Sequence, residues 1–94
     1  MNRERIRAYQ FVFRDVNKRI AHITRAHGEA ASHFLCECGE EDCVSQIKLE
    51  LHEFDEIRRN EALFIAAPGH LAEGIDRLVE VRSGFDLLIQ AAEA

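Results

Sequence analysis

The longest periodic pattern in the sequence covers the first 27 residues, where mostly apolar residues recur at alternating spacings of three and four. This is the a/d pattern of an amphipathic helix. Neither Gly nor Pro interrupts it before Gly28, a residue type that commonly ends helices. The sequence therefore predicts one long helix over residues 1–28. Its recurring positions are Ile6, Tyr9, Phe13, Val16, Ile20, Ile23 and His27.

Two interpretations of this stripe remain open. It packs against the protein's own sheet, or it associates with a second copy or another protein as a short coiled coil. Three heptads are short for an autonomous coiled coil, which weakens the second interpretation. Val12 widens the stripe, and Phe11 lies on the far side of the helix. We expect a partner surface to comprise Ile6, Tyr9, Phe11, Phe13, Val16, Ile20 and Ile23.

After Gly28 the pattern changes to short runs. Residues 43–51 alternate apolar and polar, and residues 62–67 form an apolar run that predicts a central strand. Leu51, Phe54 and Ile57 share one face of a short helix over 51–59, and Ser83-Gly84 separates two runs as a hairpin turn does. The predicted strands cover 33–36, 43–51, 62–67, 75–82 and 85–90.

These elements predict an α+β fold. A long N-terminal amphipathic helix (1–28) is followed by a small antiparallel β-sheet with one short helix (29–94), and the two regions are expected to form one compact unit.

All three cysteines lie within eight residues, Cys36, Cys38 and Cys43, in a C-x-C-x4-C pattern. Three thiols this close indicate a metal site, and Gly39 gives the backbone freedom to turn around an ion. The C-x-C spacing is tighter than that of most zinc sites. The alternative is a group of free core cysteines, which seldom stand beside acids such as Glu40.

The expected fourth ligand is His70, because the preceding Pro68-Gly69 turn fixes its direction. His33, His52 and a water molecule are the alternatives. Three thiolates and one imidazole suit tetrahedral zinc, whereas an iron–sulfur cluster usually needs four thiolates. With four protein ligands the site is closed, which is typical of structural zinc. No zinc-enzyme motif such as H-E-x-x-H is present, and Glu37 beside the cluster is the one candidate base.

The net charge of −5 is unevenly distributed along the 94 residues. Residues 1–27 carry seven Lys or Arg and two acids, whereas residues 28–94 carry five Lys or Arg and fifteen acids. The basic helix could contact nucleic acid, but an acidic body is available to neutralise it. No apolar run is long enough to span a membrane, and no signal-peptide core is present. An odd number of cysteines argues against a disulfide framework, so we expect a cytoplasmic protein.

The chain also resembles a family of small uncharacterised bacterial proteins, largely from actinobacteria, with an F-x-C-E-C-x4-C … P-G-H pattern. The matching residues are Phe34 to Cys43, the Ile47-x-Leu49 pair and Pro68 to His70, and the segment from Phe13 to Ile20 is similar to the family's N-terminal helix. Ala66 departs from the family's Val. The resemblance implies that Cys36, Cys38, Cys43 and His70 act together on a metal, and it implies no activity.

The sequence as a whole favours a small zinc-binding, non-enzymatic interaction or regulatory protein with a structural zinc site. A nucleic-acid-binding transcriptional regulator that uses the basic helix is one alternative. A zinc-dependent enzyme or a thiol redox sensor is the other.

Overall fold

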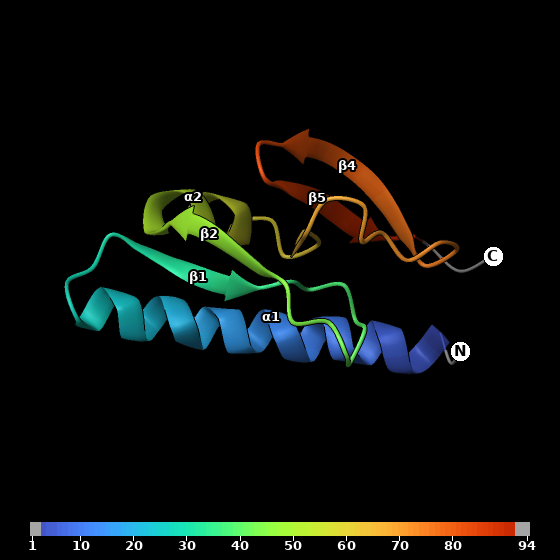
Figure 1. Cartoon of the computed structure of the whole chain (residues 1–94), viewed down its shortest axis with the longest axis horizontal. Coiled ribbons are helices and arrows are strands. Elements are labelled where there is room, and N and C mark those ends of the chain that lie inside the picture. Colours follow the sequence, from blue (N-terminus) through green and yellow to red (C-terminus); the bar gives the residue numbers. More distant parts are fainter. Residues whose placement is uncertain (1–2, 92–94) are drawn as a thin grey trace.

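A computed structural model describes residues 3–91 of the chain (Figure 1). The predicted α+β class is confirmed, with a long N-terminal helix, antiparallel strands and one short helix. The predicted strands and helices are all present, with ends shifted by a few residues. In chain order the elements are α1 (Arg3–Ala26), β1 (Ala31–Leu35), β2 (Gln46–Glu50), α2 (Leu51–Arg58), β3 (Phe64–Ala66), β4 (Asp76–Arg82) and β5 (Phe85–Gln90).

The strands form two sheets, so the prediction of a single sheet is wrong. β1 and β2 make a two-stranded antiparallel sheet, and a three-stranded antiparallel sheet has the order β3-β5-β4. The predicted central strand is also wrong, because β3 lies at an edge and β5 is central. All three residues of β3 are nevertheless buried. Other parts of the chain must therefore cover its outer edge.

The elements are arranged in layers (Figure 1). α1 forms one long side of the molecule, the β1-β2 sheet lies against it, and α2 and the three-stranded sheet lie beyond. The apolar core fills the space between these layers. At its centre the rings of Phe34 and Phe54 stack with centroids 4.3 Å apart and connect β1 to α2. Burying two Phe side chains contributes several kcal/mol.

The helix faces the core with a surface that the apolar stripe did not predict. Its buried residues, here called the inward face, are Ile6, Gln10, Arg14, Asn17, Ala21 and Thr24. Of the predicted stripe only Ile6 is buried; Tyr9, Phe13 and Ile20 are half-buried, and Val16, Ile23 and His27 are exposed. The interpretation that the stripe packs on the protein's own chain therefore holds for one edge of the stripe, and it is wrong for the exposed positions Val16, Ile23 and His27.

Apolar residues along one side of α1 form a band, here called the outer stripe, which consists of Tyr9, Val12, Val16, Ile20 and Ile23. Val12, Val16 and Ile23 are exposed, with fractions of 51%, 39% and 50%, whereas Tyr9 and Ile20 are half-buried at its edge and Ile20 also contacts the core. Phe11 lies elsewhere on the helix, with its ring edge-on to Phe64 at 5.4 Å. Phe11 thus belongs partly to the packed body.

Charge complementarity holds α1 against the acidic remainder of the chain. Lys18 lies 3.6 Å from the Glu61 carboxylate, and Arg25 forms a two-oxygen contact with Asp55 at 2.7 and 2.8 Å. Such exposed pairs contribute little stability each, but they engage part of the basic surface within the chain. Within residues 3–91, no helix combines the length and apolar character needed to cross a membrane.

Candidate metal centre

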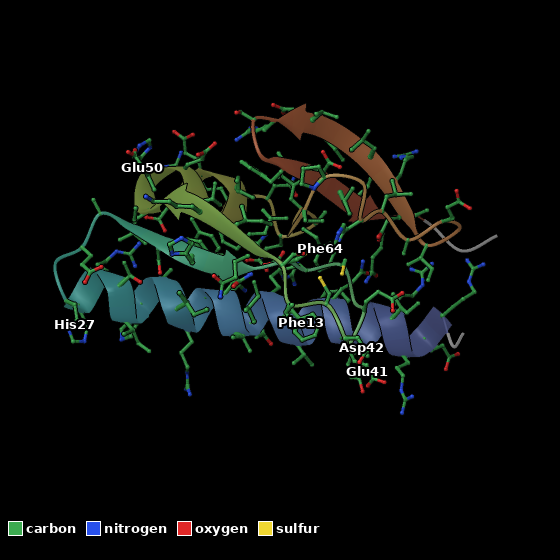
Figure 2. The ribbon with its side chains drawn as sticks, in the orientation of Figure 1. Phe13, His27, Glu41, Asp42, Glu50 and Phe64 are labelled. Atoms are coloured by element: carbon green, nitrogen blue, oxygen red, sulfur yellow. The ribbon has the colours of Figure 1, made fainter. Side chains whose placement is uncertain are left out.

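The four residues predicted as ligands come together at one point. The ligand atoms of Cys36, Cys38, Cys43 and His70 all lie within 4.8 Å of one another. Cys36 and Cys38 follow β1, Cys43 precedes β2, and His70 follows β3, so the cluster joins the two sheets. Figure 2 shows sulfur atoms, in yellow, gathered above α1.

The distances fit a tetrahedral metal ion. His70 Nδ1 lies 3.6 Å from the Sγ atoms of both Cys36 and Cys43. A tetrahedral zinc ion with bonds of about 2.3 Å to sulfur and about 2.0 Å to nitrogen separates those two ligand atoms by about 3.5 Å. The His70 ring is therefore placed close to the spacing that a Cys₃His site requires.

The alternative histidine ligands lie outside the cluster. His33 is exposed on β1, and His52 is exposed on α2, where its Nε2 contacts the Glu50 carboxylate. Over the described part of the chain, the Cys₃His group is the one set of His, Cys and acidic residues placed to hold a metal. The structure thus favours His70 over both alternatives.

Hydrogen bonds prepare the thiols for a metal. A hydrogen bond with the Cys36 thiol lowers the pKa of Cys38 to about 4 against the opposing effect of burial, and the backbone N–H of Glu40 and the side chains of His70 and Cys43 also lower it. The same interaction with Cys38, together with burial, raises the pKa of Cys36. Because the thiolate is the form that binds metal, Cys38 is ready for coordination at neutral pH.

Glu37, between the first two ligands, replaces a strand at the outer edge of β3. Its N–H donates to the Ile65 carbonyl at 2.7 Å, and its carboxylate accepts the Ile65 N–H at 2.9 Å. Two residues on, the Ala67 N–H donates to Cys36 Sγ at 3.1 Å. The metal-binding segment therefore satisfies the β3 edge that no strand pairs, and this explains why an edge strand is buried on all sides.

Glu37 has no access to solvent, so the interpretation of this residue as a candidate base finds no support. Its side chain is fully buried, and burial raises its pKa, while Arg58 at 3.4 Å and Asn17 act in the opposite direction. The carboxylate accepts hydrogen bonds from Ile65, Asn17 and Arg58, and its complete burial leaves no path for a substrate to reach it. It connects the layers instead.

The inward face of α1 holds this segment from the other side. Asn17 Nδ2 donates to the Leu35 carbonyl at 2.9 Å and to Glu37 Oε2 at 2.7 Å, and Asn17 Oδ1 accepts the Leu35 N–H at 2.8 Å. One side chain thus pairs the last residue of β1 as a neighbouring strand would. The apolar periodicity gave no signal for this role.

Gly39 brings the metal-binding turn into contact with the helix. Its φ is +84°, a conformation that favours glycine, and a Cβ there would lie 2.6 Å from the Ile6 carbonyl oxygen. The sequence prediction that Gly39 permits a tight turn is consistent with this geometry. The close approach to Ile6 could be seen only in the structure.

A buried acid also fixes the turn that carries His70. Asp86 Oδ2 accepts the Gly69 N–H at 3.1 Å, and the His70 N–H donates to the Ala67 carbonyl at 3.0 Å. The sequence held a signal for this role, since Asp86 interrupts the apolar run of β5. A buried carboxylate needs donors, and a glycine N–H in a turn is available.

Four protein side chains surround the point where a metal ion could bind, and two of the cysteines are buried. A site with four protein ligands is typical of a structural metal, whereas a catalytic site keeps one position open. Searches against family models, curated proteins and solved structures found no match to this chain. The resemblance to the bacterial family therefore stays a prediction, and the geometry of the site carries the argument about function.

Proposed function

We propose that this chain is a small zinc-binding protein, that its zinc ion is structural, and that it acts in the cell by contacting another macromolecule rather than by catalysis. Three thiolates and one imidazole at tetrahedral spacing favour zinc over harder cations, which prefer oxygen ligands. The observation that carries the proposal is the closed Cys₃His group at the junction of two sheets.

A structural role follows from the position of the ligands. Two come from the end of β1, one from the approach to β2 and one from the turn after β3, so the ion ties together segments far apart in sequence. A chain of 94 residues buries a modest share of its surface, and a metal clip adds stability that a small core lacks. Zinc binding and folding are then coupled.

Metal analysis of the purified chain tests this proposal. We expect one zinc per chain, and we expect a chelator to destabilise the fold by several kcal/mol, measured by thermal unfolding. His70→Ala should weaken zinc binding strongly, whereas His33→Ala and His52→Ala are matched controls that should not. A melting curve that chelation leaves unchanged, or full zinc retention in His70→Ala, would contradict a closed structural site.

An interaction role is supported by the outer stripe. Val12, Val16 and Ile23 are exposed on one side of the helix. A contiguous exposed apolar patch commonly marks a contact surface. A regulatory or adaptor protein of this size needs only one such surface. The thiol-rich site persists best in a reducing compartment, so we also propose a cytoplasmic location.

The two alternatives have less support. Arg14, Lys18 and Arg25 contact Glu61 or Asp55 within the chain, which leaves fewer cations for a phosphate backbone. A zinc enzyme needs an open coordination position, and four candidate protein ligands at one point favour a closed site instead. Binding to duplex DNA that weakens steeply with salt would return the nucleic-acid alternative to first place.

A further inference from the structure

We propose that the outer stripe of α1 pairs antiparallel with the outer stripe of a second copy of this chain. The proposal rests on the proposed interaction role and names the partner. α1 has 24 residues, about 36 Å of helix, and both sheets and α2 lie on one side of it in Figure 1. Val12, Val16 and Ile23 of the outer stripe are exposed, while Tyr9 and Ile20 form its half-buried edge.

The outer stripe borders a hollow that could receive an apolar side chain. Val12, Asp15, Val16 and Arg19 surround a shallow hollow of about 380 Å³. These four residues stand at positions i, i+3, i+4 and i+7, the arrangement that receives one side chain in knobs-into-holes packing between helices. The hollow therefore fits a side chain from a second helix better than a small ligand.

The spacing of the stripe is symmetric. Its five members, Tyr9, Val12, Val16, Ile20 and Ile23, are separated by three, four, four and three residues. An antiparallel pair with Val16 on its two-fold axis sets Tyr9 against Ile23 and Val12 against Ile20 of the second copy. Val16 of each copy then packs into the hollow of the other copy. The same patch therefore supplies both the inserted side chain and the hollow that receives it, and a two-fold interface requires such self-complementarity.

The charges beside the stripe favour the same arrangement. Asp15 and Arg19 lie on the same flank, and among the described residues neither forms an ion pair. In the antiparallel register, Arg19 of one copy lies within about 3 Å along the axis of Asp15 of the other. Two reciprocal ion pairs result. In a parallel pair, the flank with Asp15 and Arg19 would instead face the opposite flank of the other copy, which carries Phe13. Asp15 and Arg19 of the two copies would then not be in contact.

The solution mass of the zinc-loaded chain tests the proposal. Sedimentation or light scattering between about 1 µM and about 1 mM should show a reversible monomer–dimer equilibrium. Val16→Glu places two carboxylates on the axis and should raise the dissociation constant by about tenfold or more. Val81→Glu is the matched control, because Val81 is an exposed apolar residue on β4, and it should leave the equilibrium unchanged.

A charge exchange tests the orientation. Arg19→Glu alone sets Glu against Asp15, and Asp15→Lys alone sets Lys against Arg19, so each variant should dimerise more weakly than wild type. Mixing the two variants places Asp opposite Arg and Glu opposite Lys, and should restore a heterodimer. A mixture that stays as weak as its components would overturn the antiparallel register.

Zinc content separates this proposal from the one it rests on. A wild-type chain that is monomeric throughout, or a dimer that Val16→Glu does not weaken, overturns the second-copy assignment even when each chain holds one zinc. Acidic amphipathic helices are the competing occupant of a stripe flanked by Arg19, and binding of such a peptide to a monomeric wild-type chain would replace the second copy with that partner. Loss of zinc stoichiometry would instead overturn the structural-site proposal.

Discussion

The two long faces of α1 differ in the opposite sense from those of most surface helices. The inward face carries Gln10, Arg14, Asn17 and Thr24 into the protein, while the outer stripe presents Val12, Val16 and Ile23 to solvent. An amphipathic helix ordinarily buries its apolar side. The difference shows that specific hydrogen bonds, in addition to apolar contacts, hold α1 to its own chain.

Each buried polar side chain on the inward face has a definite partner. Gln10 Nε2 donates to both carboxylate oxygens of Asp76 at 2.8 and 3.0 Å, and the Gln10 amide oxygen accepts from Gln90 at 2.8 Å. Asn17 holds Leu35 and Glu37 beside the metal centre. Because a buried polar group is costly when its partner is lost, these contacts specify one position of the helix.

Asn17→Ala is expected to have the largest effect among the substitutions that test whether the inward face contributes more stability than the outer stripe. It leaves the N–H and carbonyl of Leu35 and one oxygen of Glu37 without a donor or acceptor, and each such loss costs about 1–3 kcal/mol. We expect a loss of about 4 kcal/mol in the free energy of unfolding, measured by urea denaturation of the zinc-loaded chain. The matched change on the outer stripe, Val12→Ala, should cost about 0.5 kcal/mol or less. Equal losses would show that the faces contribute alike.

Gly39→Ala tests the contact between the inward face and the metal-binding turn. A side chain at this positive φ costs about 1–2 kcal/mol, and the Cβ also meets backbone and side-chain atoms of Ile6, so we expect about 3 kcal/mol in total. Gly84→Ala is the control, because Gly84 has a φ of +89° and open space around it, and only the first part of the cost applies. If both variants melt at the same temperature, α1 does not restrain the turn.

The smallest expected effect is the contribution of Asp76 to the pH dependence of the free energy of unfolding. Burial raises the pKa of this carboxyl, and the hydrogen bonds from Gln10 and Ala72 oppose the shift. A group whose folded pKa lies above its unfolded pKa stabilises the fold most at low pH, and this contribution is lost as the pH rises through the folded value. Wild type should therefore lose stability over that window relative to Asp76→Asn, which cannot titrate.

Urea denaturation of both proteins across about pH 4 to pH 7 measures this difference. Glu56→Gln, at an exposed position on α2, controls for the loss of one negative charge. Parallel stability curves for wild type and Asp76→Asn would show that Asp76 titrates no differently in the folded chain.

Local sequence patterns predicted most of the secondary structure and the candidate metal-binding group. Periods of 3.6 and 2 are local properties, so they place α1, α2 and β2 without knowledge of the fold. The ligand set was equally readable, because three thiols within eight residues and a histidine after a Pro-Gly turn carry their chemistry in the residue types. These features depend on neighbours along the chain.

Which face of α1 is buried, and how the strands divide into two sheets, could be seen only in the three-dimensional structure. The polar residues Gln10 and Asn17 can be buried because residues from distant parts of the chain form hydrogen bonds with them. Gln10 pairs with Asp76, and Asn17 pairs with Leu35 and Glu37. β3 lies at an edge because Glu37 and Cys36 satisfy its backbone in place of a strand. A hydrophobic pattern gives the polarity of each residue but contains no information about hydrogen-bond partners far away in the sequence. In α1, hydrogen bonds to such partners allow polar residues to be buried where the pattern predicted apolar ones.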